Sequence, residues 1–265
     1  MEILGYFLAA MVGISLGLIG GGGSILMVPI LVYVFLLNPV MATSYSLFVV
    51  GSTSLLGAFN NYRKGLVSIK TALLFGLTSI TTVFITRKLI MPAIPDLLFS
   101  IGSFQVRHGL ATMLLFAILM FSASIAMIRG SREVIQVDSA ATSADAAKIL
   151  LYGVLIGLAT GFLGAGGGFL IIPALVLILK MPMKKAVGTS LLIIALNSLI
   201  GFTGDLGHVV IDWKFLLIIS AIAITGVFIG GALSKKIPGE KLRKAFGWFV
   251  LAMGIYIIIK ELFLK

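Results

Sequence analysis

Two glycine runs are the residues of this chain whose type and spacing could bind a ligand. The first is the four glycines at 20–23, followed by Ser24 and Pro29; the second spans 164–168, with Ala165 as its one other residue, and precedes Pro173. Glycine-rich backbone that leads into a helix presents unpaired N–H groups at the positive end of the helix dipole, and such a terminus binds anions. We expect helices to start near Ser24 and Gly168.

Nucleotide binding is the first alternative for these runs, and the sequence argues against it. A Walker loop needs Gly-Lys-Ser/Thr, and neither run contains a lysine. The dinucleotide fingerprint needs a glycine where Ile25 and Phe169 stand. A second alternative stays open, namely that the glycines only allow two helices to cross closely.

Hydroxyl and amide side chains follow each run at similar distances along the chain. Such side chains within membrane helices either bond to their own backbone or donate across a polar pathway. Read in the second way, they join the backbone amides in one predicted anion site. The predicted substrate-binding residues are Gly21, Gly22, Gly23, Ser24, Ser46, Gly166, Gly167, Gly168, Ser190 and Asn197.

Other chemistry finds little support in the sequence. There is no cysteine, no His-Glu-x-x-His run and no carboxylate pair within an apolar segment, so we expect no catalytic residues, no metal site and no cofactor. Asp205 and Asp212 are assigned to loops, and His108 and His208 to helix ends. The chain therefore lacks an obvious carboxylate or histidine for coupling transport to protons.

Composition places these residues inside a membrane. The chain has 265 residues, of which 60% are hydrophobic and 11% charged, and its mean hydropathy is +1.19. A soluble domain of this size does not reach such values, which indicates a polytopic membrane protein. The net charge of +11 is attributed to topology anchors and contacts with anionic lipid rather than to nucleic-acid binding.

The fold class expected is an all-α membrane protein with about eight hydrophobic helical elements. Each glycine run interrupts an apolar stretch of roughly 33 residues, which is too long for one bilayer crossing, so the first helix of each half must break there. The elements lie near residues 3–37, 41–60, 67–90, 107–128, 149–180, 186–203, 213–234 and 242–263.

The two halves of the chain are similar in sequence. An offset of 144 residues aligns Gly20 with Gly164, Ser46 with Ser190, and a further run of matches over about 80 positions. We therefore expect two homologous repeats, with a first transmembrane repeat at 1–130, a polar linker at 131–148 and a second repeat at 149–265. Broken helices at corresponding positions of two halves point to a transport site.

Charges in the loops indicate that the second repeat is inverted relative to the first. Arg63, Lys64 and Lys70 follow the second element, whereas the matching loop carries Asp205 and Asp212. Basic loops tend to stay cytoplasmic, and placing them all on one side requires an odd number of crossings per repeat. This scheme puts Arg87, Lys88 and Arg107 on the outside, against the rule.

Small residues recur every fourth position before each glycine run, at Ala9, Gly13 and Gly17 and again at Gly153, Gly157 and Gly161. This spacing lets another helix approach closely. We predict that these residues hold the two halves together.

At both glycine runs the sequence resembles the sulfite exporter TauE/SafE-type family of membrane permeases. The resemblance lies in the glycine run with a proline at Pro29 and Pro173, and in the Ala-x-x-x-Ser-Leu that starts at Ala42 and at Ala186. It covers essentially the whole chain. It implies transport of sulfur-containing anions such as sulfite or organosulfonates across the plasma (inner) membrane of a bacterium or archaeon.

The resulting hypothesis is a non-enzymatic, multi-pass exporter of small sulfur-containing anions. The substrate would lie near the midplane between the two glycine runs, and rocking of the halves would give alternating access. An anion channel and a carrier of another small anion stay open as alternatives. The expected partners are the anionic substrate and membrane lipid, without nucleic acid, and a homodimer also stays open.

Overall fold

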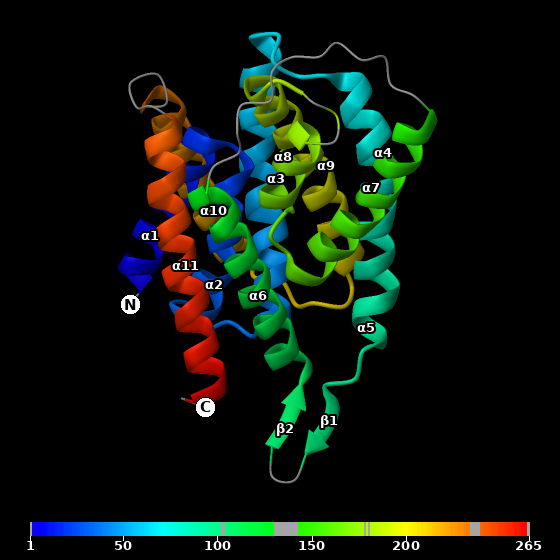
Figure 1. The fold of residues 1–265 in the computed structure, drawn as a ribbon. Coiled ribbons are helices and arrows are strands. Elements are labelled where there is room, and N and C mark those ends of the chain that lie inside the picture. The colour runs from blue at the N-terminus through cyan, green and yellow to red at the C-terminus, as the bar shows by residue number, and fades with distance from the viewer. Residues whose placement is uncertain are drawn as a thin grey trace.

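The computed structural model describes residues 2–101, 104–129, 143–177, 179, 181–233 and 239–263. These form an upright bundle of α-helices with one small β-hairpin at its lower end (Figure 1). The all-α polytopic fold is confirmed. The helices are α1 (Glu2–Ile19), α2 (Met27–Tyr33), α3 (Pro39–Arg63), α4 (Ile69–Ile85), α5 (Met91–Ala93), α6 (His108–Arg129), α7 (Ser143–Leu163), α8 (Gly168–Leu177), α9 (Met183–Asp205), α10 (Trp213–Leu233) and α11 (Gly239–Phe263).

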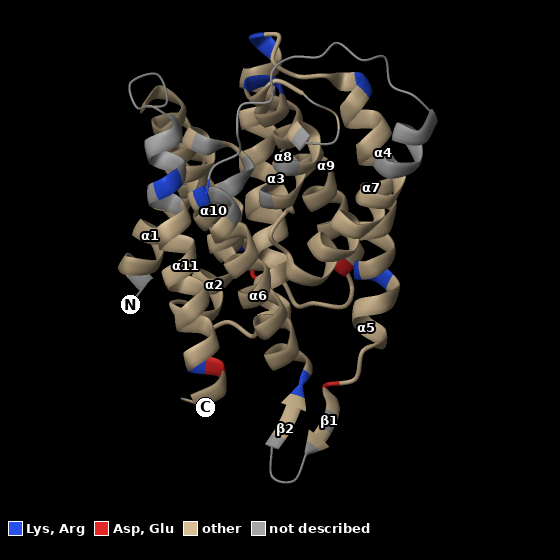
Figure 2. Cartoon of the chain, in the orientation of Figure 1, with Lys and Arg blue, Asp and Glu red and all other residues tan. Residues whose placement is uncertain are grey.

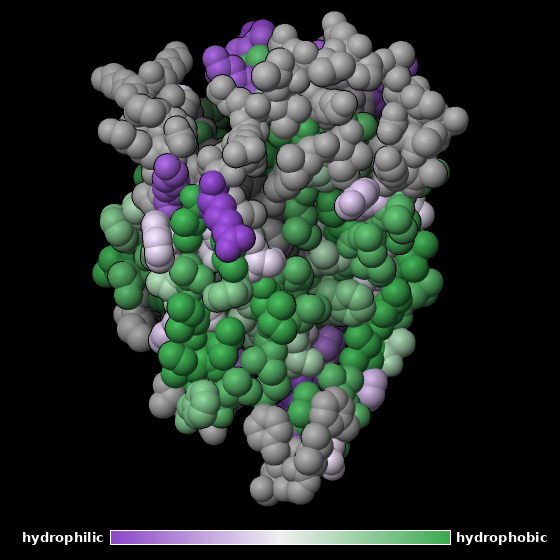
Figure 3. Space-filling view, in the orientation of Figure 1, coloured by the Kyte–Doolittle hydropathy of each residue, from purple (hydrophilic) through white to green (hydrophobic). Residues whose placement is uncertain are grey.

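Five helical segments of the described chain are long and apolar enough to cross a membrane: 39–63, 69–93, 108–125, 183–205 and 213–233. Shorter apolar helices at 3–18, 23–33 and 150–163 belong to the two broken segments. Apolar side chains cover the visible middle of the molecule (Figure 3). Leu73, Leu77 and Phe228 are among the exposed hydrophobic residues of the described chain. In water such a belt would be unstable, whereas lipid tails solvate it.

Both glycine runs do interrupt a helix, as predicted. After α1 the chain turns at Gly20, where φ is +82°, and forms the 3-10 helix η1 (Gly21–Leu26) before α2. After α7 it turns at Gly164, Gly166 and Gly167, all with positive φ, before α8. A residue with a Cβ is strained in this left-handed region, so glycine is needed at these turns.

The core of the bundle is the crossing of α3 and α9, which run antiparallel. Leu66, just after α3, reaches Gly188 near the start of α9, whereas Asp205 at the end of α9 reaches Thr43 near the start of α3 through Arg87. Many polar side chains of these two helices are fully buried, among them Ser46, Ser190 and Asn197. Their hydroxyls and amides therefore lie in the protein interior and not against lipid.

The small-residue spacing holds helices together across the molecule, as predicted. In α1, a Cβ added at Gly13 would overlap the backbone of Ala223 in α10, and one at Gly17 would overlap Val227. In α7, a Cβ at Gly157 would fall within 2.7 Å of Ser79 and Thr82 in α4. Each broken helix thus packs on a helix from the other half of the chain, at backbone distance.

Helix directions are those of an inverted arrangement. Along α1 and α10 the contacts advance together, and the same holds for α7 and α4, so both pairs are parallel. α4 runs in the direction of α9, since Gly201 meets Val83 and Gly204 meets Arg87, and α10 begins beside the start of α3, where Asp212 bonds Tyr45. Because α3 and α9 are antiparallel, α1 and α7 then run in opposite directions. The offset between Pro39 and Met183, which begin α3 and α9, equals that of the sequence match. The duplication itself remains an inference from the sequence.

Several boundaries differ from the expected ones. Most of the predicted linker, residues 130–142, lies outside the described residues, but Ser143 already begins α7, inside the range assigned to the linker. The strands β1 (Leu97–Ile101) and β2 (Phe104–Arg107), paired antiparallel, were not expected. They lie between two predicted apolar segments, and these short stretches show no clear strand pattern in the sequence.

Candidate functional site

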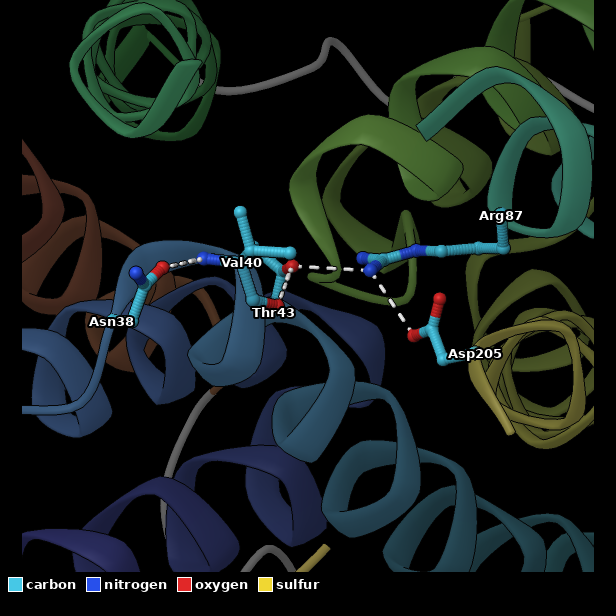
Figure 4. Close-up of polar contacts among 5 residues, drawn as sticks. All are labelled: Asn38, Val40, Thr43, Arg87 and Asp205. Carbon is cyan, nitrogen blue, oxygen red and sulfur yellow. Dashed lines mark hydrogen bonds and ion pairs between the residues drawn. The ribbon is translucent and has the colours of Figure 1, made fainter. Parts of the chain in front are cut away.

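A buried ion pair between Arg87 and Asp205 is the most unusual polar feature among the described residues. Nη1 of Arg87 lies 3.1 Å from Oδ2 of Asp205, and the two side chains are 1% and 5% exposed. Nη1 also donates to the hydroxyl of Thr43 at 3.1 Å (Figure 4). Charged side chains at membrane depth are costly, and when present they pair with one another and mark a functional site.

The first turn of α3 fixes one side of this pair. The Thr43 hydroxyl donates to the Val40 carbonyl at 2.8 Å, while the Val40 N–H donates to the Asn38 side chain, which caps the helix (Figure 4). Thr43 therefore has its proton committed to Val40 and offers a lone pair to Arg87. The start of α3 therefore fixes the position of the Thr43 hydroxyl, which orients the Arg87 guanidinium.

Local backbone features of α4 and α9 make room for Arg87. It lies in the π-helical turn η2 (Thr86–Ile90), which widens the end of α4. Opposite it, Gly204 has no side chain, and a Cβ there would lie 3.0 Å from the Cβ of Arg87. π-helical turns of this kind occur frequently at functional sites.

The guanidinium keeps hydrogen-bonding capacity to spare. Nε and Nη2 of Arg87 have no hydrogen-bond partner, although both atoms are buried. Arginine stays positively charged and presents its N–H groups in a planar fork that matches carboxylate, sulfonate and phosphate oxygens. The unpaired N–H groups of this fork can therefore donate hydrogen bonds to an oxyanion.

The second glycine run and the end of α7 contact the neighbours of this ion pair. A Cβ at Gly164 would overlap the backbone and Cβ of Thr43, and one at Gly161, a turn earlier in α7, would lie 2.7 Å from the side chain of Thr86. The run therefore touches Thr43, which accepts from Arg87, and α7 touches Thr86, which precedes Arg87 in the chain. Residues that are far apart in the sequence therefore meet here at the ends of α3, α4 and α7.

Unpaired hydroxyls point at the same run. A Cβ at Gly166 would lie 3.0 Å from Oγ of Ser198 in α9, and one at Gly167 would overlap Oγ1 of Thr160 in α7. Both hydroxyls are buried and have no hydrogen-bond partner in the described structure. A buried hydroxyl without a partner costs stability, which a bound ligand would recover.

The first glycine run lacks a counterpart of the ion pair, although a Cβ at Gly23 would lie 2.6 Å from the buried, unpaired Oγ of Ser15. By the offset of 144 residues, its counterparts of Thr43, Arg87 and Asp205 are Val187, Gly231 and Asn61. A Cβ at Gly20 would lie 2.6 Å from the Val187 side chain, so an apolar group stands where the second run meets a hydroxyl. The structure also corrects one expectation about the first run: helical backbone, in the form of the 3-10 helix η1, starts at Gly21 and not near Ser24.

The predicted site residues that the structure describes are all at buried positions. Ser46 lies between Thr43 and Val50 on the face of α3 that meets the second run, and its hydroxyl has no partner. Ser190 donates to the Val187 carbonyl of its own helix. Asn197 donates to Ser79 at 2.6 Å and keeps an unpaired Oδ1.

The two runs also lie close to each other, since η1 packs on α8. Gly23, Ser24, Gly166, Gly167 and Gly168 are buried, and the surroundings of Gly21 and Gly22 are not described. Anion binding by the ten predicted residues remains a prediction.

A cavity of about 520 Å³ lies between the start of α3, the β-hairpin and the end of α11. Asn38 and Val40 line it on one side, and Asp96, Arg107 and Glu261 lie around it. Asn38 and Val40 are also the first two members of the hydrogen-bonded chain that ends on Arg87. The cavity is therefore separated from the guanidinium by the first turn of α3.

Arg87 and Asp205 were both missed by the sequence analysis. Asp205 was assigned to a loop, and no acidic residue was expected in a span, but it is the last residue of α9 and is 4% exposed. The sequence analysis treated Arg87 as a loop charge on the outer side of the membrane and did not expect its side chain to be buried in the bundle. The one available signal was the conflict of Arg87 with the charge rule for loops.

Basic side chains gather at the end of the bundle away from the β-hairpin (Figure 2). Arg63 and Lys64 lie at the end of α3, Lys70 lies at the start of α4, and Lys184 and Lys185 lie at the start of α9. All five are exposed. By the rule for basic loops this end faces the cytoplasm. The ion pair lies nearer the other end.

Comparison with known proteins gives one consistent result. A relative from Xylella fastidiosa (strain 9a5c), named "Probable membrane transporter protein", is 33% identical over 252 residues, which cover 94% of this chain and 91% of that protein. "Probable membrane transporter protein YunE" of Bacillus subtilis is 27% identical, with 93% of each chain covered. No solved structure matches the chain significantly.

The sequence profile of the family described as "Sulfite exporter TauE/SafE" matches residues 6–257. That range contains both glycine runs, the ion pair and every described membrane helix at least in part. Together with the relatives and the apolar helices, it identifies a multi-pass transporter of the bacterial or archaeal cell membrane. The chain belongs to the sulfite exporter TauE/SafE family of membrane proteins.

Proposed function

We propose that this protein transports small sulfur-containing anions, such as sulfite or organosulfonates, and exports them from the cell. The observation that carries the proposal is the pair of unpaired Arg87 donors, Nε and Nη2, on a guanidinium whose partner Thr43 contacts Gly164 of the second glycine run. A sulfite or sulfonate group has three oxygens on one atom. It can accept from the arginine fork and from neighbouring hydroxyls at the same time.

Arg87 supplies the positive charge in this site, and the glycine run lets the anion approach the backbone closely. Because Gly164, Gly166 and Gly167 carry no side chain, the anion's path is bounded by backbone there. Ser198 and Thr160 donate hydrogen bonds that have no other acceptor in the described structure. The predicted donors Ser46 and Asn197 lie on the helices α3 and α9 that cross at the site.

The packing of the helices supports an alternating-access mechanism. The pairs α1 with α10 and α4 with α7 are joined at backbone distance, so each pair moves as one body. The antiparallel α3 and α9 lie between these bodies. Rocking of one body against the other would open the site first to the basic end and then to the cavity near Asn38.

A flux assay tests the proposal. Purified protein in liposomes is loaded with radiolabelled sulfite or methanesulfonate, and efflux is followed against substrate concentration. We expect saturable efflux and chemically unchanged substrate, as for a permease without catalytic activity. Non-saturating conductance in planar bilayers would indicate a channel instead, and the absence of flux for every sulfur anion would refute the proposal.

Ser198→Ala separates a binding role from a structural one. The buried hydroxyl has no partner in the described protein, so its loss should not lower thermal stability and should raise it slightly. A hydrogen bond to a charged ligand is worth about 1.5–3 kcal/mol, so KM should rise about tenfold or more. Ser220→Ala is the matched control, since Ser220 is also buried but donates to the Leu216 carbonyl of its own helix. Equal KM for wild type and Ser198→Ala would remove Ser198 from the site.

A further inference from the structure

We infer that Asp205 carries a proton across the membrane together with each anion, so that the transporter is an electroneutral anion and proton symporter. This inference rests on the proposed function. It assigns the coupling ion to a carboxylate that forms the other half of the Arg87 ion pair. The sequence analysis expected no such group.

Charge balance in the buried site is the physical reason. In the described state the positive charge of Arg87 is neutralised by Asp205 at 3.1 Å, with both side chains withdrawn from solvent. If a monovalent anion also bound Arg87, the site would hold one positive and two negative charges. A net charge buried in protein is strongly unfavourable, even after relaxation.

Protonation of Asp205 removes that cost. The proton comes from water on the side where the site is open and binds a carboxylate oxygen of Asp205. The anion then binds the Nε and Nη2 side of Arg87, and the neutral Asp205 stays beside Nη1. The loaded site contains Arg87, one anion and a neutral carboxylic acid, so it has the same net charge as the empty site. On the other side the anion leaves, the proton returns to water and the ion pair forms again.

Few other titratable groups face this carboxylate. Arg87 contacts it from the end of α4, and His208, exposed in the loop after α9, interacts with it electrostatically. His108 at the start of α6 faces Arg87 and Asp96. From α3 the side chain of Ser44 interacts with the Asp205 carboxylate, and its hydroxyl does not titrate in this range. Lys88 is directed to the ring of Phe84, with 5.3 Å between Nζ and the ring centroid.

The inference also changes what drives export. An electroneutral cycle is not driven by membrane potential. It releases the anion from the cell only while the ratio of internal to external anion exceeds the opposing ratio of proton concentrations. Such a cycle suits disposal of an anion that accumulates inside, and it runs in reverse when the outside is acidic.

The experiment measures anion and proton movement in the same liposomes. Protein is reconstituted with a pH-sensitive dye inside, and radiolabelled methanesulfonate, which stays ionised at all working pH values, is added outside. For the wild type we expect uptake that acidifies the lumen and does not respond to a potassium diffusion potential. Uptake without acidification, or uptake driven by the potential, would overturn the inference alone. No uptake of any sulfur anion would overturn the proposed function with it.

Variants of Asp205 locate the coupling. Asp205→Asn should still carry methanesulfonate but without acidifying the lumen, and its uptake should become sensitive to membrane potential, because the empty site is now positive. Asp205→Glu should restore proton movement. Asp212→Asn is the matched control, since Asp212 is an exposed carboxylate in the same loop region, and it should behave as wild type. Acidification by Asp205→Asn at the wild-type rate would refute the assignment; if that variant does not fold, the wild-type measurements decide.

Discussion

Removing one member of the Arg87–Asp205 pair should harm the protein more than removing both. Arg87→Gln leaves the carboxylate of Asp205 buried and unpaired, and the loss of one partner of a buried ion pair costs about 3–5 kcal/mol. Asp205→Asn leaves the guanidinium unpaired, with a similar cost. In the double variant the two neutral amides can bond to each other, so we expect a total of only about 1–2 kcal/mol.

Reversible unfolding in mixed micelles of a mild detergent and sodium dodecyl sulfate gives the four stabilities that this comparison needs. Circular dichroism at 222 nm follows the loss of helix. The control is Arg63→Gln, because Arg63 is exposed at the end of α3, and we expect a change of about 0.5 kcal/mol or less. If the effects of the two single substitutions simply add up in the double variant, the residues are not coupled and the charge-balance reasoning fails.

Two glycine substitutions test the packing and the turn at the broken helices. Gly13→Ala should destabilise the protein by about 1–3 kcal/mol, because the new Cβ would overlap the backbone of Ala223 in α10, whereas Gly231→Ala, with open space at its Cβ, should be neutral. Unfolding midpoints of the two variants check this. At Gly164 the backbone has a positive φ and a new Cβ would overlap Thr43, whereas at Gly207 the φ is also positive but the space around the Cβ is open. Gly164→Ala should therefore destabilise the protein more than Gly207→Ala. Equal unfolding midpoints for these two variants would argue against tight packing at the second run.

The helices could be predicted from the sequence because the membrane imposes a strong rule. Every backbone N–H and C=O in lipid must be bonded within its own segment, so an apolar stretch of sufficient length is a helix. This placed α6 and α10 to within a residue or so and located both interruptions at their glycines. The β-hairpin at 97–107 lies at the end of the bundle, where that rule does not apply, and it was missed.

The ion pair could not be predicted because each partner lies at the end of an apolar segment. A hydropathy profile treats such residues as solvated ends, and it does not show that α4 continues through a π-helical turn or that α9 extends to Asp205. Burial of both residues follows from the crossing of α3 and α9, which is a property of packing. The close contacts of the small residues, by contrast, follow from spacing within one helix, and so the sequence shows them.

One anion should bind per chain, although the scaffold contains two similar glycine runs. The second run is bordered by Thr43 and the ion pair, whereas Val187, Gly231 and Asn61 occupy the corresponding positions at the first run. An apolar side chain there offers no hydrogen bond and no charge, so an anion would lose its hydration without compensation. Isothermal titration calorimetry of the purified protein with methanesulfonate should give a stoichiometry near one. Arg87→Lys should weaken binding by about tenfold or more, because lysine lacks the planar fork. Two equal sites, or unchanged affinity in Arg87→Lys, would show that the glycine backbone alone holds the anion and that the ion pair serves only to join α4 to α9.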